Sequence, residues 1–175
     1  MAAYSDNSCP GIVPAVKMSA GVEWALHCCT VLSTSNAPVP VNRLAELHDI
    51  SHTYLAKHMQ ALSSAGLIRA VEGRDGGYLL ARPGHDITVL DIVLAIDGRE
   101  PAFRCTEIRQ QGPLPTTGEA CKVPCGIAQV MATAERAWRD SLRSVTLADL
   151  AAQVDATSPG AWESVGAWLS VGGRR

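Results

Sequence analysis

The fold is decided by residues 41–82, VNRLAELHDISHTYLAKHMQALSSAGLIRAVEGRDGGYLLAR. Leucines at helical spacing predict a short helix over 41–47, and a second apolar stripe predicts a longer helix over 51–65 with its first residue as N-cap. The stripe of the longer helix consists of Leu55, Met59 and Leu62. Residues 49–51 are typical of a tight turn, and Gly66 suits the C-terminal end of the second helix. The stretch therefore predicts a helix-turn-helix.

A hairpin is predicted directly after the second helix. Two short β-like runs, over 67–71 and 77–81, flank the sequence Gly73-Arg74-Asp75-Gly76. Glycine and aspartate between two such runs indicate a two-stranded antiparallel hairpin. A helix-turn-helix followed by a hairpin is a winged helix-turn-helix, in which the hairpin forms the wing.

The rest of the chain is predicted to be helix and loop. Apolar residues at helical spacing predict helices over 18–32, 87–97 and 126–143. N-caps are expected at Ser19 for the first of these, at Thr88 for the second, and at Thr146 for a short helix that begins with LADL. The fold class is therefore mainly α, a winged helix-turn-helix with a small β-hairpin wing and a long C-terminal helix.

Two segments lack helical periodicity. Residues 98–124 form a polar stretch rich in Pro and Gly, and a Gly- and Ser-rich tail begins at residue 155. Trp162 and Trp168 suggest that part of this tail packs against the fold.

Composition limits the classes of function. The chain has 175 residues, 47% of them hydrophobic and 18% charged, with a net charge of −2. This is globular composition, and it excludes a uniformly basic surface for nucleic acid while leaving room for a local basic face. No run of about 18 apolar residues without a charge occurs, and the N-terminus lacks the features of a signal peptide. We therefore expect a cytoplasmic protein without membrane contact.

The predicted helix-turn-helix favours DNA binding. In a winged helix, the helix after the turn enters the major groove and the wing touches the backbone or minor groove. Residues 41–82 carry five Lys or Arg against four Asp or Glu, a small basic excess. Such modules also serve as protein-contact modules, so both interpretations stay open from the pattern alone. The candidate DNA-contacting residues are Ser51, His52, Thr53, Tyr54, Lys57, His58 and Gln60 on the helix, and Arg69, Arg74, Gly76 and Tyr78 on the hairpin.

The cysteines fall into two groups. Cys28 and Cys29 lie in the apolar run WALHCCTVL and are expected to fill the core. Cys105, Cys121 and Cys125 lie instead in the polar loop, where no core needs filling. Cysteines grouped in an irregular loop of a protein without an export signal are most often metal ligands or redox thiols.

Cys121 and Cys125 have the spacing C-x3-C at the start of the predicted long helix, where they could converge on one metal. Zinc and iron–sulfur clusters both require four ligands, so three cysteines leave either site one ligand short. A histidine or a carboxylate from elsewhere must complete it. The histidine candidates are His27, His48, His52, His58 and His85.

Several motifs together resemble the Rrf family of bacterial transcription regulators. They are MSAGVEWALHCC, LAELHDISHTYLAKHMQALSSAGLIRAVEGRDGGYLLAR, ITVLDIVLAIDG, the three-cysteine loop, the long helix and LADL. The resemblance covers about residues 17–154. It implies a homodimer of winged helices crossed by the long C-terminal helices, a pseudo-palindromic double-stranded DNA operator, and an iron–sulfur cluster whose state sets operator affinity.

The loop CTEIRQQGPLPTTGEACKVPC is longer and less evenly spaced than the compact cysteine loop of most members, and it is similar to that of the redox-sensing RsrR branch. That similarity implies a 2Fe–2S cluster with ligands from both protomers. Carried over by motif, the ligands are Glu23 and His48 of one protomer with Cys121 and Cys125 of the other. Cys105 then matches a position that is not a ligand, although as a third loop cysteine it stays a candidate redox thiol or extra ligand.

The resemblance also implies a division of the chain and a mechanism. The predicted helix over 51–65, which would enter the major groove, is the recognition helix. His48 directly precedes the turn into this helix, and Trp24 follows Glu23, so a redox change at the cluster could move the recognition helix. Simple core packing explains Trp24 equally well. The expected segments are a flexible leader (1–16), a winged-helix domain (17–98), a sensor loop (99–125), a dimerisation helix with the LADL helix (126–154) and a C-terminal tail (155–175).

We therefore expect a redox-responsive transcription regulator, not an enzyme, because no nucleophile–base arrangement is visible. No small-molecule substrate is expected. One alternative is a regulator without iron, which uses a zinc site or a thiol switch through Cys105. Another is an iron–sulfur electron carrier or cluster-transfer protein whose helical module contacts a protein partner.

Overall fold

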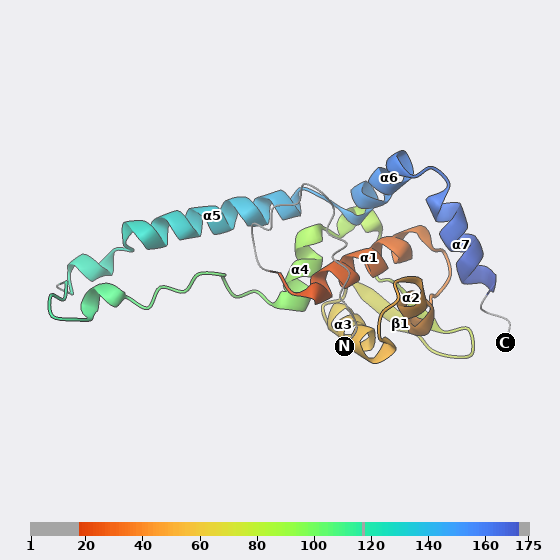
Figure 1. Ribbon diagram of the computed structural model, residues 1–175, viewed down its shortest axis with the longest axis horizontal. Coiled ribbons are helices and arrows are strands. Elements are labelled where there is room, and N and C mark those ends of the chain that lie inside the picture. Colours follow the sequence, from red (N-terminus) through yellow and green to blue (C-terminus); the bar gives the residue numbers. More distant parts are fainter. Residues whose placement is uncertain (1–17, 117, 172–175) are drawn as a thin grey trace, which may run out of the picture.

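The chain folds into a helical body and an arm that projects from it (Figure 1). The computed structural model describes residues 18–116 and 118–171, so the predicted leader lies outside the described residues. Its elements are α1 Ala20–Thr34, α2 Val41–Leu47, α3 His52–Ser64, β1 Ile68–Val71, β2 Gly77–Leu80, α4 Val89–Asp97, α5 Gly126–Arg143, α6 Leu147–Thr157 and α7 Ala161–Val171, with short 3-10 turns η1 Gly84–Asp86, η2 Ile108–Gln110 and η3 Ala120–Lys122. The predicted mainly α winged helix-turn-helix is confirmed.

The turn of the helix-turn-helix closes as a Schellman motif at the end of α2. Asp49 has φ +50°, the left-handed conformation expected just after a helix. The backbone N–H of Ile50 donates to Ala45 O at 2.9 Å, and that of Asp49 donates to Glu46 O at 3.3 Å. These bonds satisfy the last carbonyls of α2. They also fix the direction in which α3 leaves, with His48 as the last residue of the helix end.

The wing is a two-stranded antiparallel sheet whose register pairs Ile68 with Leu80 and Val71 with Gly77. Val39 extends the sheet by bonding Tyr78 in both directions, at 2.9 and 3.0 Å. The wing is therefore tied to the segment between α1 and α2.

Helix α1 is the centre of the body and packs against α3, α4, α6, α7 and β2. Cys28 and Cys29 are fully buried on it, as predicted for core residues. Burial raises the pKa of the Cys28 thiol to about 12 and that of Cys29 further, so both thiols stay protonated and inert. The buried stripe of α3 also lies in this core, and it consists of Leu55, Met59 and Leu62.

All four predicted N-cap residues occupy their positions, but only two of them form a side-chain cap bond. Thr88 begins α4 and Thr146 begins α6, each with a complete capping box. Ser51 and Ser19 occupy the N-cap positions of α3 and α1 without a side-chain cap bond. The hydroxyl of Ser19 instead donates to the carboxylate of Asp97, which ties the start of α1 to the end of α4.

The C-terminal segment is more helical than predicted. Helix α6 runs from the LADL sequence to Thr157, so the boundary expected at residue 154 falls inside a helix, and α7 follows where a Gly- and Ser-rich tail was expected. Trp162 donates from its indole N–H to Ala151 O at 3.0 Å. The guanidinium of Arg43 on α2 stacks on the ring of Trp168 at 3.5 Å. The two tryptophans therefore anchor α7 to α6 and α2, as their presence suggested.

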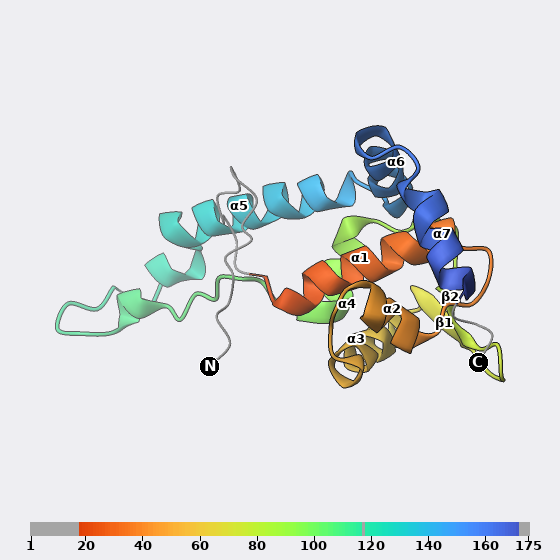
Figure 2. The same ribbon diagram turned by 45° about the vertical axis from the view of Figure 1, so that its right-hand side comes forward.

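The arm consists of α5 and the loop that leads to it, and both views show it extending away from the body (Figures 1 and 2). It is anchored at one end only, where Trp138 and Leu142 pack against Val22, Val89 and Val93. Farther out, α5 exposes apolar side chains, namely Ile127, Val130 and Met131. No described helix is long and apolar enough to cross a membrane.

Gly77 supports a prediction about the wing. A Cβ at this position would lie 2.5 Å from the carbonyl oxygen of Val39, inside van der Waals contact with fixed backbone. We expect Gly77→Ala to lower the free energy of unfolding by about 1–3 kcal/mol, as overpacking does elsewhere. Urea unfolding followed by circular dichroism at a fixed protein concentration measures this.

The matched control is Gly166→Ala in α7, where an added Cβ meets nothing within 4 Å. That substitution should leave stability unchanged or raise it by up to about 1 kcal/mol, because alanine is the better helix former. Equal stability of the two variants would contradict the described contact between the wing and Val39.

Candidate DNA interface and metal site

Helix α3 presents a polar face to solvent while its apolar stripe is buried. The exposed candidates on or next to this helix are Ser51, His52, Thr53, Tyr54, Lys57 and Gln60. Within the described residues, none of their side chains forms a hydrogen bond or an ion pair with another residue. Hydroxyls, an amide and an ammonium group are the groups that contact phosphates and base edges in DNA complexes.

The wing contributes charge through two of its four predicted residues. Arg69 and Arg74 are exposed. Gly76 is needed to form the turn, since a Cβ at this position would lie 2.9 Å from Gly73 O. Tyr78 is partly buried against the core, where its backbone pairs with Val39. The structure thus gives Gly76 and Tyr78 roles in shaping the wing.

His58 is less exposed than the other candidates of α3, and its ring faces α1. A Cβ on Gly21 of α1 would lie 2.9 Å from its Nδ1, so glycine makes room for the ring. Burial lowers the pKa of His58, and the nearby Lys57 lowers it further while Asp97 opposes the change. The ring therefore connects the recognition helix to the start of α1.

Aromatic contacts extend this connection toward the predicted metal ligands. The Trp24 ring of α1 meets Tyr54 of α3 edge to face, with centroids 5.5 Å apart. Tyr54 meets His58 in the same way at 4.6 Å. Trp24 is half-buried, and its neighbour Glu23 is exposed. Trp24, which is next to the predicted ligand Glu23, therefore contacts the predicted recognition helix α3 directly.

Two of the predicted ligands line one hollow. A cavity of about 350 Å³ is lined by Glu23, Trp24, His27, His48, Asp49 and Ile50. His48 Nε2 is buried and has no hydrogen-bond partner within the described residues. The rings of His27 and His48 lie 5.6 Å apart, and burial followed by the charge of His27 lowers the pKa of His48. The lowered pKa favours the neutral form of the His48 ring, which is the form that ligates metals.

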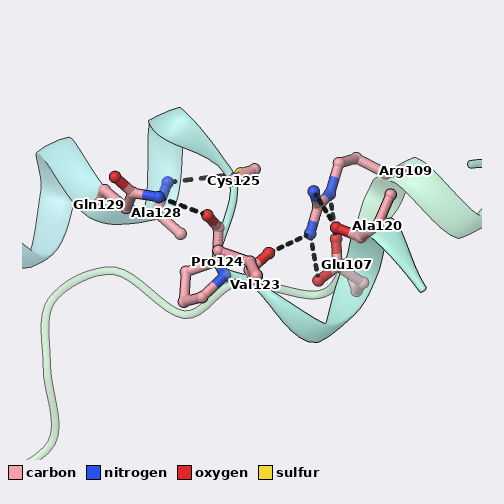
Figure 3. Close-up of polar contacts among 8 residues, drawn as sticks. All are labelled: Glu107, Arg109, Ala120, Val123, Pro124, Cys125, Ala128 and Gln129. Carbon is pink, nitrogen blue, oxygen red and sulfur yellow. Dashed lines mark hydrogen bonds and ion pairs between the residues drawn. The ribbon is translucent and has the colours of Figure 1, made fainter. Parts of the chain in front are cut away.

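The cysteines lie at the outer end of the arm. Cys125 is the N-cap of α5, and its Sγ accepts from the N–H of Ala128 at 3.5 Å (Figure 3). Cys121 lies one turn earlier in η3, and both thiols are half-buried and free. Cys105 is exposed, and it lines a second cavity of about 670 Å³ together with Cys121. The predicted position of the C-x3-C pair at a helix N-terminus is confirmed.

A single chain does not bring the four predicted ligands together. Glu23 and His48 belong to the body, and the Cys121–Cys125 segment lies at the far end of the arm (Figure 1). Among the described residues, no group of three or more His, Cys, Asp or Glu side chains is close enough to hold a metal ion. The chain thus carries the four predicted ligands as two separate pairs.

Two residues, one at the hollow and one at the cysteine turn, could not be singled out from the sequence. His27 was one of five equal histidine candidates, although its i, i+4 spacing from Glu23 places both on one face of α1. Arg109 was not considered, because only the folded loop shows that its guanidinium bonds the segment that carries Cys121.

The comparisons with known proteins agree on one family. The family model described as "Rrf2: Iron-dependent Transcriptional regulator" matches residues 18–153. The HTH-type transcriptional regulator YffB of Lactococcus lactis is 31% identical over 142 residues, covering 78% of this chain and 87% of that protein.

Two solved structures have the same fold. The structure of T. potens IscR is 25% identical with a TM-score of 0.61, covering 82% of this chain and 92% of that one. CymR, the global cysteine regulator of B. subtilis, is 24% identical with a TM-score of 0.62, covering 79% and 98%. Family model, curated relative and fold together show a transcriptional regulator and not an enzyme. This chain therefore belongs to the Rrf2 family of DNA-binding transcriptional regulators.

Proposed function

We propose that this regulator works as a homodimer that holds a 2Fe–2S cluster at each of two shared sites, and that the oxidation state of the cluster controls affinity for a pseudo-palindromic operator. The observation that carries the proposal is the separation of two incomplete donor pairs. Glu23 and His48 line a hollow on the body, and Cys121 and Cys125 lie at the end of the arm. Two chains related by a two-fold axis can bring the pairs together twice.

The donor set fits a 2Fe–2S cluster. Two thiolates would hold one iron, and a histidine nitrogen with a carboxylate would hold the other, in the mixed pattern that Rieske centres illustrate with two histidines. His48 Nε2 is a buried atom that lacks a partner, and the Glu23 carboxylate forms no ion pair among the described residues. Both donors are therefore free to bind a cluster whose other ligands come from the partner protomer.

The arm supplies the means of dimerisation. Ile127, Val130 and Met131 of α5 are exposed beyond the point where Trp138 anchors the helix to the body. A contiguous apolar row on a projecting helix indicates a protein–protein contact. Packing of the arm across the partner would bury this row and carry the cysteines toward the partner's α1 and α2.

A short series of contacts links the hollow to the helix proposed to bind DNA. When bound, the cluster supplies a one-electron change of charge. Glu23 and Trp24 are adjacent on α1, and Trp24 contacts Tyr54 of the recognition helix. His48 lies at the turn into the same helix, so a small displacement of either ligand is transmitted to α3. A coupling of about 1–3 kcal/mol would change operator affinity about five- to 150-fold.

A thiol switch is the second candidate, and one observation favours it. Cys105 and Cys121 line the same cavity of about 670 Å³. Oxidation of these two thiols to a disulfide would need no metal, and it would make Cys121 unavailable as a ligand. The two electrons and two protons would pass to an oxidant such as a peroxide or another disulfide. Colourless protein whose DNA binding depends on Cys105 would support this candidate over the cluster.

Spectroscopy of anaerobically purified protein tests the cluster. We expect a coloured dimer with one 2Fe–2S unit per protomer by iron and sulfide assay, and an EPR signal only after reduction with dithionite. Zinc-containing or metal-free protein would contradict the proposal.

His48→Ala should change or abolish the visible and EPR spectra, because the substitution removes the nitrogen ligand. Circular dichroism should show the fold intact. His85→Ala is the control, since His85 is exposed and does not line the hollow. A wild-type spectrum for His48→Ala would remove this residue from the ligand set.

Lys57→Ala should weaken binding to operator and random DNA alike and lower the slope of log K against log salt by about one, because the ammonium contacts a phosphate. Arg143→Ala, which removes an exposed charge paired with Asp140 at the base of the arm, is the control. An unchanged salt slope would place Lys57 away from the phosphates.

A further inference from the structure

We propose that Arg109 is the positioning residue of the cysteine pair: its guanidinium holds the turn that carries Cys121 and Cys125 and places a fixed positive charge next to that segment. The inference rests on the proposed cluster for the second of these effects. The first concerns the protein alone.

Arg109 binds the backbone on both sides of Cys121 (Figure 3). Its Nη1 donates to Ala120 O at 3.3 Å, and its Nη2 donates to Val123 O at 3.2 Å. Among the described residues, no other group donates a hydrogen bond to these two carbonyls. These two bonds join the turn that carries Cys121 to the preceding part of the loop.

Glu107 orients the guanidinium. Arg109 Nε donates to Oε1 at 2.5 Å and Nη2 to Oε2 at 2.9 Å, a two-pronged ion pair on partly buried side chains. Glu107 adopts φ +53°, a conformation that residues other than glycine rarely adopt, so the loop accepts strain at the residue that aims Arg109. The ion pair also lowers the pKa of the Glu107 carboxyl, which keeps it charged.

The backbone of Arg109 adds a third link. Its carbonyl accepts from the N–H of Thr116 at 2.8 Å, which closes the excursion between η2 and η3. On the other side of the cysteines, Gln129 of α5 donates to Pro124 O at 2.7 Å. The C-x3-C segment is therefore held from the loop side by Arg109 and from the helix side by α5.

The guanidinium also acts through its charge. The guanidinium bonds the carbonyls of Ala120 and Val123, so its positive charge lies next to the segment that carries Cys121 and Cys125. The neighbouring Lys122 is exposed and paired with Glu119. An electron added to the site adds negative charge, so the fixed cation favours the reduced form and raises the midpoint potential.

Three variants separate geometry from charge. Arg109→Gln removes both, and Arg109→Lys keeps the charge but loses the fork that reaches two carbonyls and a carboxylate. Arg104→Gln is the matched control, because Arg104 lies in the same loop and pairs with Glu100 on exposed side chains, away from the cysteine turn. All three are made in the full-length chain.

Geometry is measured by hydrogen exchange in metal-free protein. The amides of Cys121 and Lys122 donate to Gly118 and Glu119 within the turn. We expect both Arg109 variants to speed their exchange about tenfold, with peptides of α3 unchanged, and Arg104→Gln to match the wild type. Wild-type exchange in Arg109→Gln would overturn the positioning role, whether or not the protein binds iron.

Charge is measured by EPR-monitored redox titration of the protein as isolated with its cluster. We expect the midpoint potential to fall in Arg109→Gln and to stay near the wild-type value in Arg109→Lys and Arg104→Gln. An unchanged potential in Arg109→Gln overturns the electrostatic role. Colourless wild-type protein overturns the proposed cluster and this electrostatic role, and the exchange measurement then decides the positioning role by itself.

Discussion

The anchoring of α5 at one end only is the constraint on which the rest of the structure depends. Trp138 and Leu142 fix the helix to the body, and the other half extends away with its apolar side chains exposed. The Cys121–Cys125 segment at the tip of the arm therefore lies far from the hollow that Glu23 and His48 line in the same chain (Figure 1). In the proposed homodimer, a second chain would cover the apolar row and supply the missing donors.

Helix α1 contributes both to the core and to the hollow. Its inner face fills the core with Cys28 and Cys29, and its outer face carries one side of the hollow. The contact between Trp24 and Tyr54 then connects that hollow to the DNA-reading helix without any intervening loop. Rigid packing on one side and a polar hollow on the other suit a helix that transmits small displacements.

Much of the fold was predictable, because it depends on local periodicity. The bounds of α5 and α2, the turn at Asp49 and the hairpin all follow from apolar spacing and turn residues. Helix α7 was missed because Gly and Ser disfavour helices locally, whereas Trp162 and Trp168 stabilise it through tertiary contacts. In the candidate site, the cap position of Cys125 was predictable, but the role of Arg109 depends on carbonyls eleven and fourteen residues away in an irregular loop.

The central claim is that the metal site is shared between protomers, and mixed dimers test it most directly. One chain carries Cys121→Ser and Cys125→Ser, and the other carries Glu23→Gln and His48→Ala. The two chains bear different affinity tags, so that only the mixed dimer is purified. Each homodimer should be colourless, and the mixed dimer should contain one 2Fe–2S cluster per dimer, because one of its two sites keeps all four ligands. A mixed dimer without iron, beside a wild-type dimer with two clusters, would contradict the shared site.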